Sequence, residues 1–244
     1  MRICRFSTAA QVGRAAAAII AAQLLRKPDS VLGLATGSTP VPTYDELVRL
    51  HQGGVADFSR AVSFNLDEYV GIPVDHPCSY HRFMDEHLFD RVNMRREAIH
   101  VPDGLAPDLS AAATAYDAAI DAAGGIDLQI LGIGRNGHIG FNEPGEHFVY
   151  GCHRVALSPS TIEANKRFFP SEEAVPRHAV SLGIGSIMQA RQVLLIATGE
   201  EKAEAVRQAL EGDVSPLWQA SILRTHPDVI FLLDQAAASR LTRR

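Results

Sequence analysis

The chain has 244 residues, of which 46% are apolar and 21% are charged, as in ordinary globular proteins. Its formal charge of −5 argues against a nucleic-acid partner. The longest apolar run, Ala15 to Leu25, is too short to span a bilayer, so we expect a buried helix and no membrane partner.

Three scattered cysteines, Cys4, Cys78 and Cys152, form neither a disulfide framework nor a zinc-binding spacing. A short strand-like run, Arg2 to Phe6, follows Met1 directly, without the apolar segment of a signal peptide. We therefore expect a cytoplasmic protein without a metal site.

Strands and helices are predicted to alternate along the chain without a linker. The predicted strands are apolar runs: Arg2–Phe6, Ser30–Ala35, Ala61–Asn65, Ala98–Val101, Ile126–Leu131, Cys152–Leu157, His178–Leu182, Gln192–Ala197 and Asp228–Leu233. The predicted helices are residues 8–26, 41–51, 79–89, 108–123, 160–169, 200–211 and 216–223, and a short one from residue 236 onward. This alternation predicts a single α/β domain over residues 1–244.

A glycine and small hydroxyl side chains follow the second predicted strand, at Gly37, Ser38 and Thr39. Backbone N–H groups at a helix N-terminus point outward, and the helix dipole favours negative charge there. The segment therefore favours phosphate binding, with an ordinary Ser/Thr helix cap as the alternative.

Two adjacent carboxylates, Asp67 and Glu68, follow the third predicted strand. Such a pair suits general base catalysis if one carboxylate is desolvated while its neighbours hold the other. An acidic surface turn is the alternative. The nearby His76, His81 and His87 lack a clear metal-binding spacing and are interpreted as surface or packing residues.

The segment Leu131 to Gly145, LGIGRNGHIGFNEPG, places Asn136, His138 and Glu143 in a glycine-rich loop after a buried strand. Histidine between an amide and a carboxylate suits proton transfer near neutral pH. Open α/β sheets bind ligands past the carboxyl ends of their strands. The alternative is a structural histidine beside a solvated loop carboxylate.

Two basic residues later in the chain, Arg167 and Lys202, lie in different sequence contexts. An exposed arginine such as Arg167 most often forms a surface ion pair. Lys202 falls in the first turn of a predicted helix, where the dipole disfavours a cation unless it serves an anion.

Seven collinear blocks cover nearly the whole chain: LGLATGSTPVPTY from Leu32, FNLDEY from Phe64, HPCSYHRFM from His76, LGIGRNGHIGFNEPG from Leu131, ANKRFF from Ala164, GEEKAEAV from Gly199 and SILRTH from Ser221. Together they resemble the glucosamine-6-phosphate deaminases, also called isomerases. The resemblance implies a doubly wound, mostly parallel sheet with helices on both faces. It also implies conversion of glucosamine 6-phosphate and water to fructose 6-phosphate and ammonia, without metal or organic cofactor.

By this resemblance, Asp67 is the base that moves the C2 proton to C1, and His138 opens the pyranose ring. Glu143 and Asn136 orient His138. The phosphate site comprises Gly37, Ser38, Thr39, Arg167 and Lys202. We further expect a lid around residues 153–181, and a monomer or small homo-oligomer that binds a sugar phosphate.

Two departures from the family pattern are visible. Many members have aspartate where this chain has Asn136, whose carbonyl can still accept the imidazole N–H. Allosterically activated members carry a basic cluster where this chain has Gly145–His153, which contains no Arg or Lys. We therefore expect hyperbolic kinetics without an allosteric activator.

We classify the chain as a hydrolase acting on an amino-sugar phosphate. One alternative is a 6-phosphogluconolactonase-like hydrolase, which should not need the full FNLDEY block together with Glu143. The other is a non-catalytic sugar-phosphate sensor domain, whose relatives carry an N-terminal helix-turn-helix ahead of the first strand.

Overall fold

A computed structural model describes residues 1–242 and is built on a seven-stranded sheet. Every neighbouring pair of strands in this sheet is parallel. The strand order is β1 (Arg2–Phe6), β10 (Val229–Asp234), β9 (Gln192–Ala197), β6 (Leu128–Leu131), β2 (Val31–Leu34), β3 (Val62–Asn65) and β5 (Ile99–His100). The sequence patterns predicted all seven strands.

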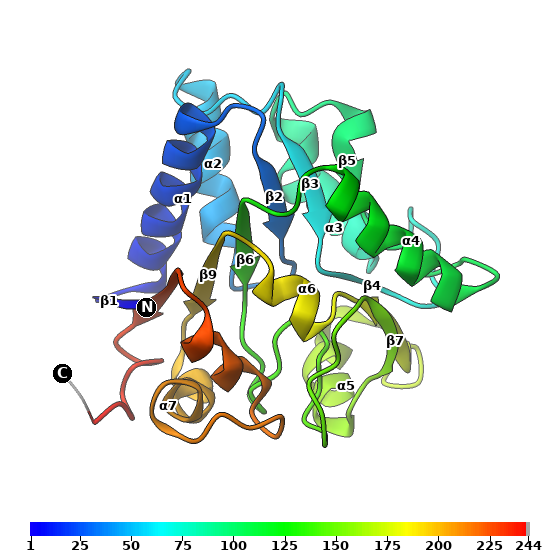
Figure 1. The fold of residues 1–244 in the computed structure, drawn as a ribbon, viewed down its shortest axis with the longest axis vertical. Coiled ribbons are helices and arrows are strands. Elements are labelled where there is room, and N and C mark those ends of the chain that lie inside the picture. Colours follow the sequence, from blue (N-terminus) through cyan, green and yellow to red (C-terminus); the bar gives the residue numbers. More distant parts are fainter. Residues whose placement is uncertain (243–244) are drawn as a thin grey trace.

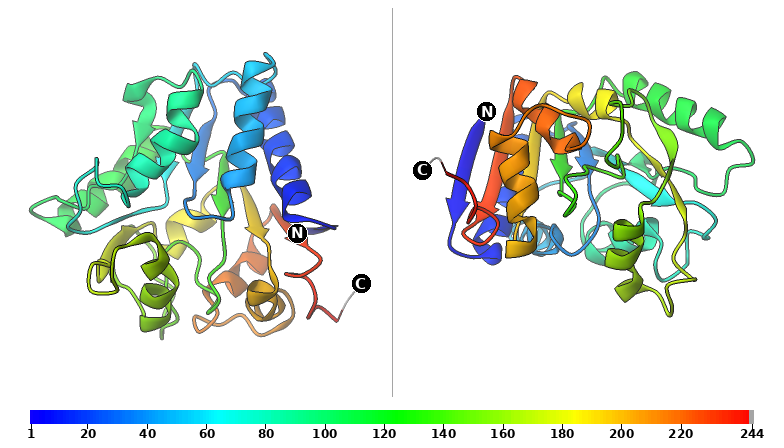
Figure 2. Two further views of the ribbon diagram at one scale, coloured as in Figure 1. Left: turned by 180° about the vertical axis from the view of Figure 1, so that it is seen from behind. Right: turned by 90° about the horizontal axis from the view of Figure 1, so that it is seen from below.

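Helices cover both faces of this sheet. One face carries α1 (Ala9–Arg26), α2 (Val41–Gln52) and α3 (Tyr80–His87), and the other carries α4 (Leu109–Ala122) and α6 (Ile184–Met188) (Figures 1 and 2). Every residue of β2, β6 and β10 is buried. Strands covered on both sides have no polar face, which explains their continuous apolar runs. The predicted doubly wound α/β fold is confirmed.

The direction of winding reverses at β2. The chain moves from β2 to β3 and β5 toward one edge, then returns to β6 and continues through β9 to β10. The loops after β2 and β6 therefore diverge at the carboxyl ends of the strands, which point toward the lower part of Figure 1, and residues of both loops line a cavity there.

A second, three-stranded antiparallel sheet lies beyond those ends. It comprises β4 (Asp67–Tyr69), β8 (His178–Ser181) and β7 (His153–Ala156), with Asp67 opposite Ser181. It packs on a separate apolar cluster of Tyr69, Phe141, Leu157, Ile162, Phe169, Val175 and Ala179. The sequence analysis predicted β7 and β8 but placed Asp67 to Tyr69 at the end of β3 rather than in a strand of another sheet.

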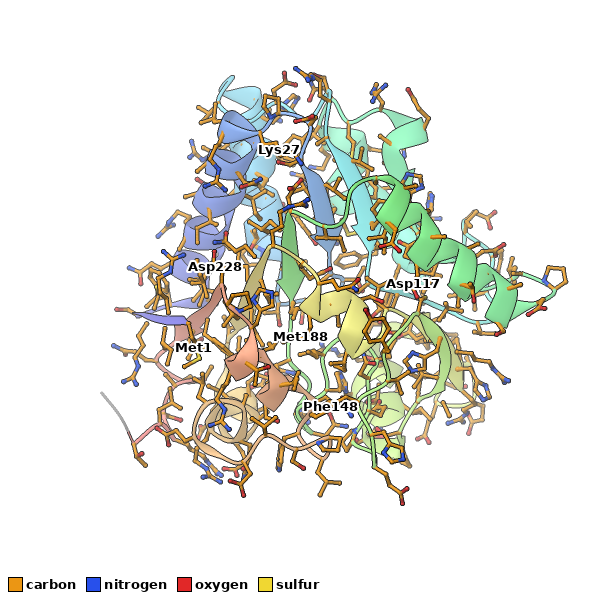
Figure 3. The ribbon with its side chains drawn as sticks, in the orientation of Figure 1. Met1, Lys27, Asp117, Phe148, Met188 and Asp228 are labelled. Carbon is orange, nitrogen blue, oxygen red and sulfur yellow. The ribbon has the colours of Figure 1, made fainter. Side chains whose placement is uncertain are left out.

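Asp117 joins the helix layer to this second sheet. Its carboxylate accepts hydrogen bonds from the Cys152 backbone N–H at 2.6 Å and the Ser186 hydroxyl at 2.8 Å. One side chain on α4 thus holds the start of β7 and α6 together (Figure 3). Lys27, also labelled in Figure 3, pairs with Asp127 at 2.7 Å near the amino ends of the strands, away from the cavity.

Several predicted helices differ in the structure. The helix predicted at Pro216–Leu223 is instead a 3₁₀-helix, η5 (Gln219–Thr225), at whose start the Gln219 side chain donates to the carbonyls of Glu143, His147 and Pro216. Residues 235–240 form turns, so the helix predicted from residue 236 onward is absent from the part of the chain described, which ends at residue 242.

The predicted helix at 160–169 divides into α5 (Pro159–Asn165) and η3 (Lys166–Phe168). The one predicted at 200–211 divides into η4 (Glu200–Lys202) and α7 (Ala203–Glu211). The sequence analysis missed α6.

Candidate active site

The loop after β2 forms one wall of this cavity. Gly37, Ser38 and Thr39 line it, and Gly37 has a φ of 92°, a conformation that favours glycine. Arg167 donates to the Ser38 hydroxyl at 3.2 Å. This contact links η3, which directly follows α5, to the loop that precedes α2.

Three cations, Arg135, Arg167 and Lys202, line the same end of the cavity. Burial lowers the pKa of Lys202, and the charges of Arg135 and Arg167 lower it further, against the opposing effect of Glu201. Mutual repulsion among cations is relieved by a bound anion. This end of the cavity therefore suits a phosphate group.

Asp67 lies on another wall, in β4. Its side chain is buried, with a residue exposure of 6%, yet it reaches the cavity. Among residues 1–242, no group donates a hydrogen bond to this carboxylate. Burial, and secondarily the charge of Glu68, raises the pKa of Asp67 to about 8. An unsolvated carboxylate of this kind is a strong proton acceptor once ionised.

Glu68, the next residue along β4, is also buried, and burial raises its pKa, but its carboxylate has hydrogen-bond donors that oppose this shift. Its carboxylate accepts backbone N–H groups from Tyr69 at 2.8 Å, Tyr80 at 3.0 Å and His81 at 2.9 Å. Successive side chains of a strand point to opposite sides, so Glu68 binds the start of α3 while Asp67 faces the cavity. This is the predicted division between a desolvated carboxylate and one held by its neighbours.

His138 lies in the loop after β6, with Glu143 behind it. The His138 Nδ1 atom lies 3.4 Å from Glu143 Oε2. Glu143 also accepts hydrogen bonds from Asn136 Nδ2 at 2.7 Å, the Thr161 hydroxyl at 2.5 Å and the Ser158 N–H at 3.3 Å. Burial alone would raise the pKa of Glu143, but the His138 contact and these donors lower it to about 2.

Asn136 orients His138 differently from the expectation. Its carbonyl accepts the backbone N–H of His138 at 3.3 Å, not the imidazole N–H, while its amide donates to Glu143. Asparagine supplies both a donor and an acceptor, which explains how it can bridge the two residues. Its influence on the imidazole therefore passes through Glu143.

Eight of the nine predicted site residues line this one cavity, and Glu143 lies directly behind His138. Several other residues line the cavity that no sequence pattern predicted: Tyr80, Arg135, Ser160, Thr161, Asn165 and Glu201. Arg135 adjoins Asn136 in the segment Leu131 to Gly145, so its position in the sequence could have predicted that it lies at the site. Thr161 has no such signal, because its bond to Glu143 depends on how α5 packs.

Within residues 1–242, no three His, Cys, Asp or Glu side chains are grouped so as to hold a metal ion. None of the helices described combines the length and apolarity needed to cross a membrane.

Residues 5–231 match the family of glucosamine-6-phosphate isomerases and 6-phosphogluconolactonases. The chain belongs to this family. Among its members, the glucosamine-6-phosphate deaminase of Clostridioides difficile is 53% identical over 94% of this chain and 92% of its own length. The deaminase of Rhodopirellula baltica is also 53% identical, over 93% and 91%.

Solved structures of this fold differ in how similar they are to this chain. A monomeric glucosamine-6-phosphate deaminase superposes with a TM-score of 0.96 at 44% identity, covering 98% of this chain and 99% of that one. A 6-phosphogluconolactonase from Thermotoga maritima reaches a TM-score of 0.75 at 23% identity, over 96% and 99%, and shares the fold alone.

Proposed function

We propose that this protein converts glucosamine 6-phosphate and water to fructose 6-phosphate and ammonia. One observation carries the proposal: a cation-rich cavity brings together a desolvated carboxylate, Asp67, and a histidine–carboxylate pair, His138 and Glu143. Relatives about half identical to this chain carry the same activity in their names.

The phosphate binds at the cationic end of the cavity. Gly37, Ser38 and Thr39 supply backbone and hydroxyl groups, while Arg167 and Lys202 supply charge. Because the phosphate does not react, these contacts hold substrate and transition state alike and act mainly on KM. They position the sugar carbons between Asp67 and His138.

Ring opening is the task of His138. Its Nδ1 faces Glu143, which leaves Nε2 as the nitrogen that can exchange a proton with the ring oxygen. With a pKa of about 2, Glu143 stays ionised at neutral pH and stabilises the imidazolium form. The open-chain sugar then presents C2 with an acidic proton beside its aldehyde.

Asp67 performs the proton transfer that follows. Its ionised carboxylate removes the C2 proton, and the same carboxyl returns that proton to C1. Meanwhile the aldehyde oxygen gains the proton that the amine loses, which leaves a hydroxyl at C1 and an imine at C2. Water then adds at C2, and the carbon–nitrogen bond breaks to release ammonia and leave the ketone. An isomerase step thus precedes deamination, so classification simply as a hydrolase is too narrow.

Residues 153–181 act as a lid in this proposal. They include Arg167, whose contact with Ser38 bridges the second sheet's segment and the phosphate loop. We further propose that the protein works in the cytoplasm as a monomer or small homo-oligomer, without cofactor or allosteric activator. Light scattering of the purified protein tests the assembly state.

Ammonia release tests the proposed activity. Purified protein is offered glucosamine 6-phosphate, galactosamine 6-phosphate and 6-phosphogluconolactone in parallel. We expect ammonia and fructose 6-phosphate from the first substrate. Lactone hydrolysis without ammonia would favour a lactonase, and binding without turnover of any substrate would favour a sensor domain.

A further inference from the structure

Arg135 is a cavity cation to which the proposed mechanism gives no role. It lies on a tight turn in which the Gly137 N–H donates to the Gly134 carbonyl at 3.0 Å, while the Gly134 N–H donates to the His138 carbonyl at 2.9 Å. Arg135 and Asn136 are the two central residues of this turn. Asn136 points inward to Glu143, whereas Arg135 is exposed and lines the cavity.

Arg135 lies among other positively charged side chains. Within the part of the chain described, no carboxylate forms an ion pair with Arg135. Its charge instead acts on Lys202, together with that of Arg167. By contrast, Arg207 and Arg240, which lie elsewhere in the chain, both form ion pairs with Glu204. An arginine held by a rigid turn against two other cations is placed for an anion.

We propose that Arg135 is a third cationic ligand of the substrate phosphate, reaching it from the loop that carries His138. This inference deepens the proposed function and rests on a sugar phosphate being the substrate. A phosphate monoester carries close to two negative charges at neutral pH, so Arg167 and Lys202 alone leave no excess of positive charge beside Glu201. Adding Arg135 brings the three cations and Glu201 to a net charge of +2, which balances the phosphate, and attracts the anion toward the cavity mouth.

The position of Arg135 also joins the two ends of the site. Phosphate binding to Arg135 restrains the turn whose next residue, Asn136, holds both the His138 backbone and Glu143. Anchoring the phosphate therefore steadies the ring-opening group. Arg135 is a binding and positioning residue, since it has no contact with the reacting carbons.

The test compares Arg135→Gln and Arg135→Lys with Arg60→Gln. Arg60 is an exposed arginine just before the amino end of β3, whereas the cavity lies past the carboxyl ends of the strands, so its variant makes the same charge change away from the site. We expect Arg135→Gln to raise KM for glucosamine 6-phosphate roughly fivefold to twentyfold, as for one charge-assisted contact partly screened by water. It should also flatten the decline of kcat/KM with salt. Arg135→Lys should recover part of both effects, and Arg60→Gln should resemble wild type.

A binding measurement separates this inference from the proposed activity. Calorimetry with glucose 6-phosphate, which has no amino group to lose, should show the same weakening of affinity in Arg135→Gln. Glucose, which has no phosphate, should have the same affinity for wild type and variant. If the wild-type protein binds glucose 6-phosphate more tightly than Arg135→Gln does but releases no ammonia from glucosamine 6-phosphate, the proposed activity is wrong and the inference stands. An unchanged affinity and salt dependence in Arg135→Gln would overturn the inference. So would an equal loss of kcat in all Arg135 variants with KM unchanged, because that indicates a role only in turn shape.

Discussion

Two carboxylates at the site, the buried Asp67 and the partly buried Glu143, show how environment assigns chemistry to identical functional groups. Asp67, in the small antiparallel sheet, receives no hydrogen bond from the residues described, and its pKa is raised to about 8 by burial and by Glu68. Glu143, in the loop after β6, is partly buried but receives several hydrogen bonds, and its pKa falls to about 2. Burial alone therefore does not decide the charge of a carboxylate; the donors around it do.

The contrast explains the division of labour that we propose. A proton acceptor needs a pKa near the working pH, which Asp67 has. A group that stabilises a neighbouring imidazolium must remain ionised throughout, as Glu143 does. Exchanging the two environments would disable both steps.

The largest expected effect comes from Asp67→Asn. Asparagine cannot accept the C2 proton, so kcat should fall by about 10²–10⁴-fold, the range for loss of a general base. Solvent deuterium should no longer enter the substrate at C2, as followed by proton NMR, while KM changes little. Wild-type exchange in this variant would rule out Asp67 as the base.

Glu143→Gln should have the next largest effect. The amide keeps the shape but removes the charge opposite His138, a loss of about 1.5–3 kcal/mol for a charge-assisted contact, or roughly 10–100-fold in kcat. Deuterium exchange at C1 of the open-chain ketose, followed in the reverse direction with ammonia present, should be spared, because that step belongs to Asp67. Equal losses in both assays would contradict separate roles.

The sequence predicted the large sheet better than the small one. Strands β2 and β6 are covered on both faces, so their apolar runs are visible locally. The pairing of Asp67 with Ser181 joins residues more than a hundred positions apart, and no local pattern encodes it. The desolvation of Asp67 follows from that pairing.

The same difference separates the site residues that were predicted from those that were missed. Asn136, His138 and Glu143 occupy one loop, where spacing alone brings them together. Thr161 reaches Glu143 only because α5 docks beside that loop. At η5, Gln219 likewise reaches the Glu143 carbonyl, a contact between distant parts of the chain that no local pattern encodes.

The stability of Asp67→Asn should also depend on pH. Because the folded-state pKa of Asp67 is raised from 3.8 to about 8, the neutral acid is favoured by folding. Its contribution to stability is therefore present below about pH 4 and is lost as pH rises through about 8. Asparagine stays neutral, so the Tm of the variant should exceed that of wild type at pH 9, by about 2–4 °C per kcal/mol recovered. Below pH 4, scanning calorimetry should show the two proteins converging.

Glu68→Gln should sharpen the comparison through the pH profile. In wild type, kcat/KM should rise with pH to a plateau as Asp67 ionises, with an apparent pKa near 8. Removing the Glu68 charge eliminates the smaller cause of that shift, so the rising limb should move to lower pH. A limb that stays in place would show that Glu68 does not act on Asp67.

The smallest effect is expected from Thr161→Val. One of several donors to Glu143 is lost, and the remaining ones keep the carboxylate ionised. A net loss of about 0.5–1.5 kcal/mol corresponds to roughly a two- to tenfold fall in kcat. Thr161→Ser keeps the hydroxyl and should match wild type. A larger loss in Thr161→Val than in Glu143→Gln would mean that Thr161 acts on the substrate itself.

The most direct test of this division is an NMR titration of the two carboxyl groups. Carbon-13 signals of Asp67 and Glu143, assigned with Asp67→Asn and Glu143→Gln, are followed across pH in the free protein. We predict that Asp67 titrates near pH 8 and that Glu143 stays ionised until about pH 2. Two carboxyl groups that both titrate near pH 4 would contradict the account, because neither environment would then have assigned a role.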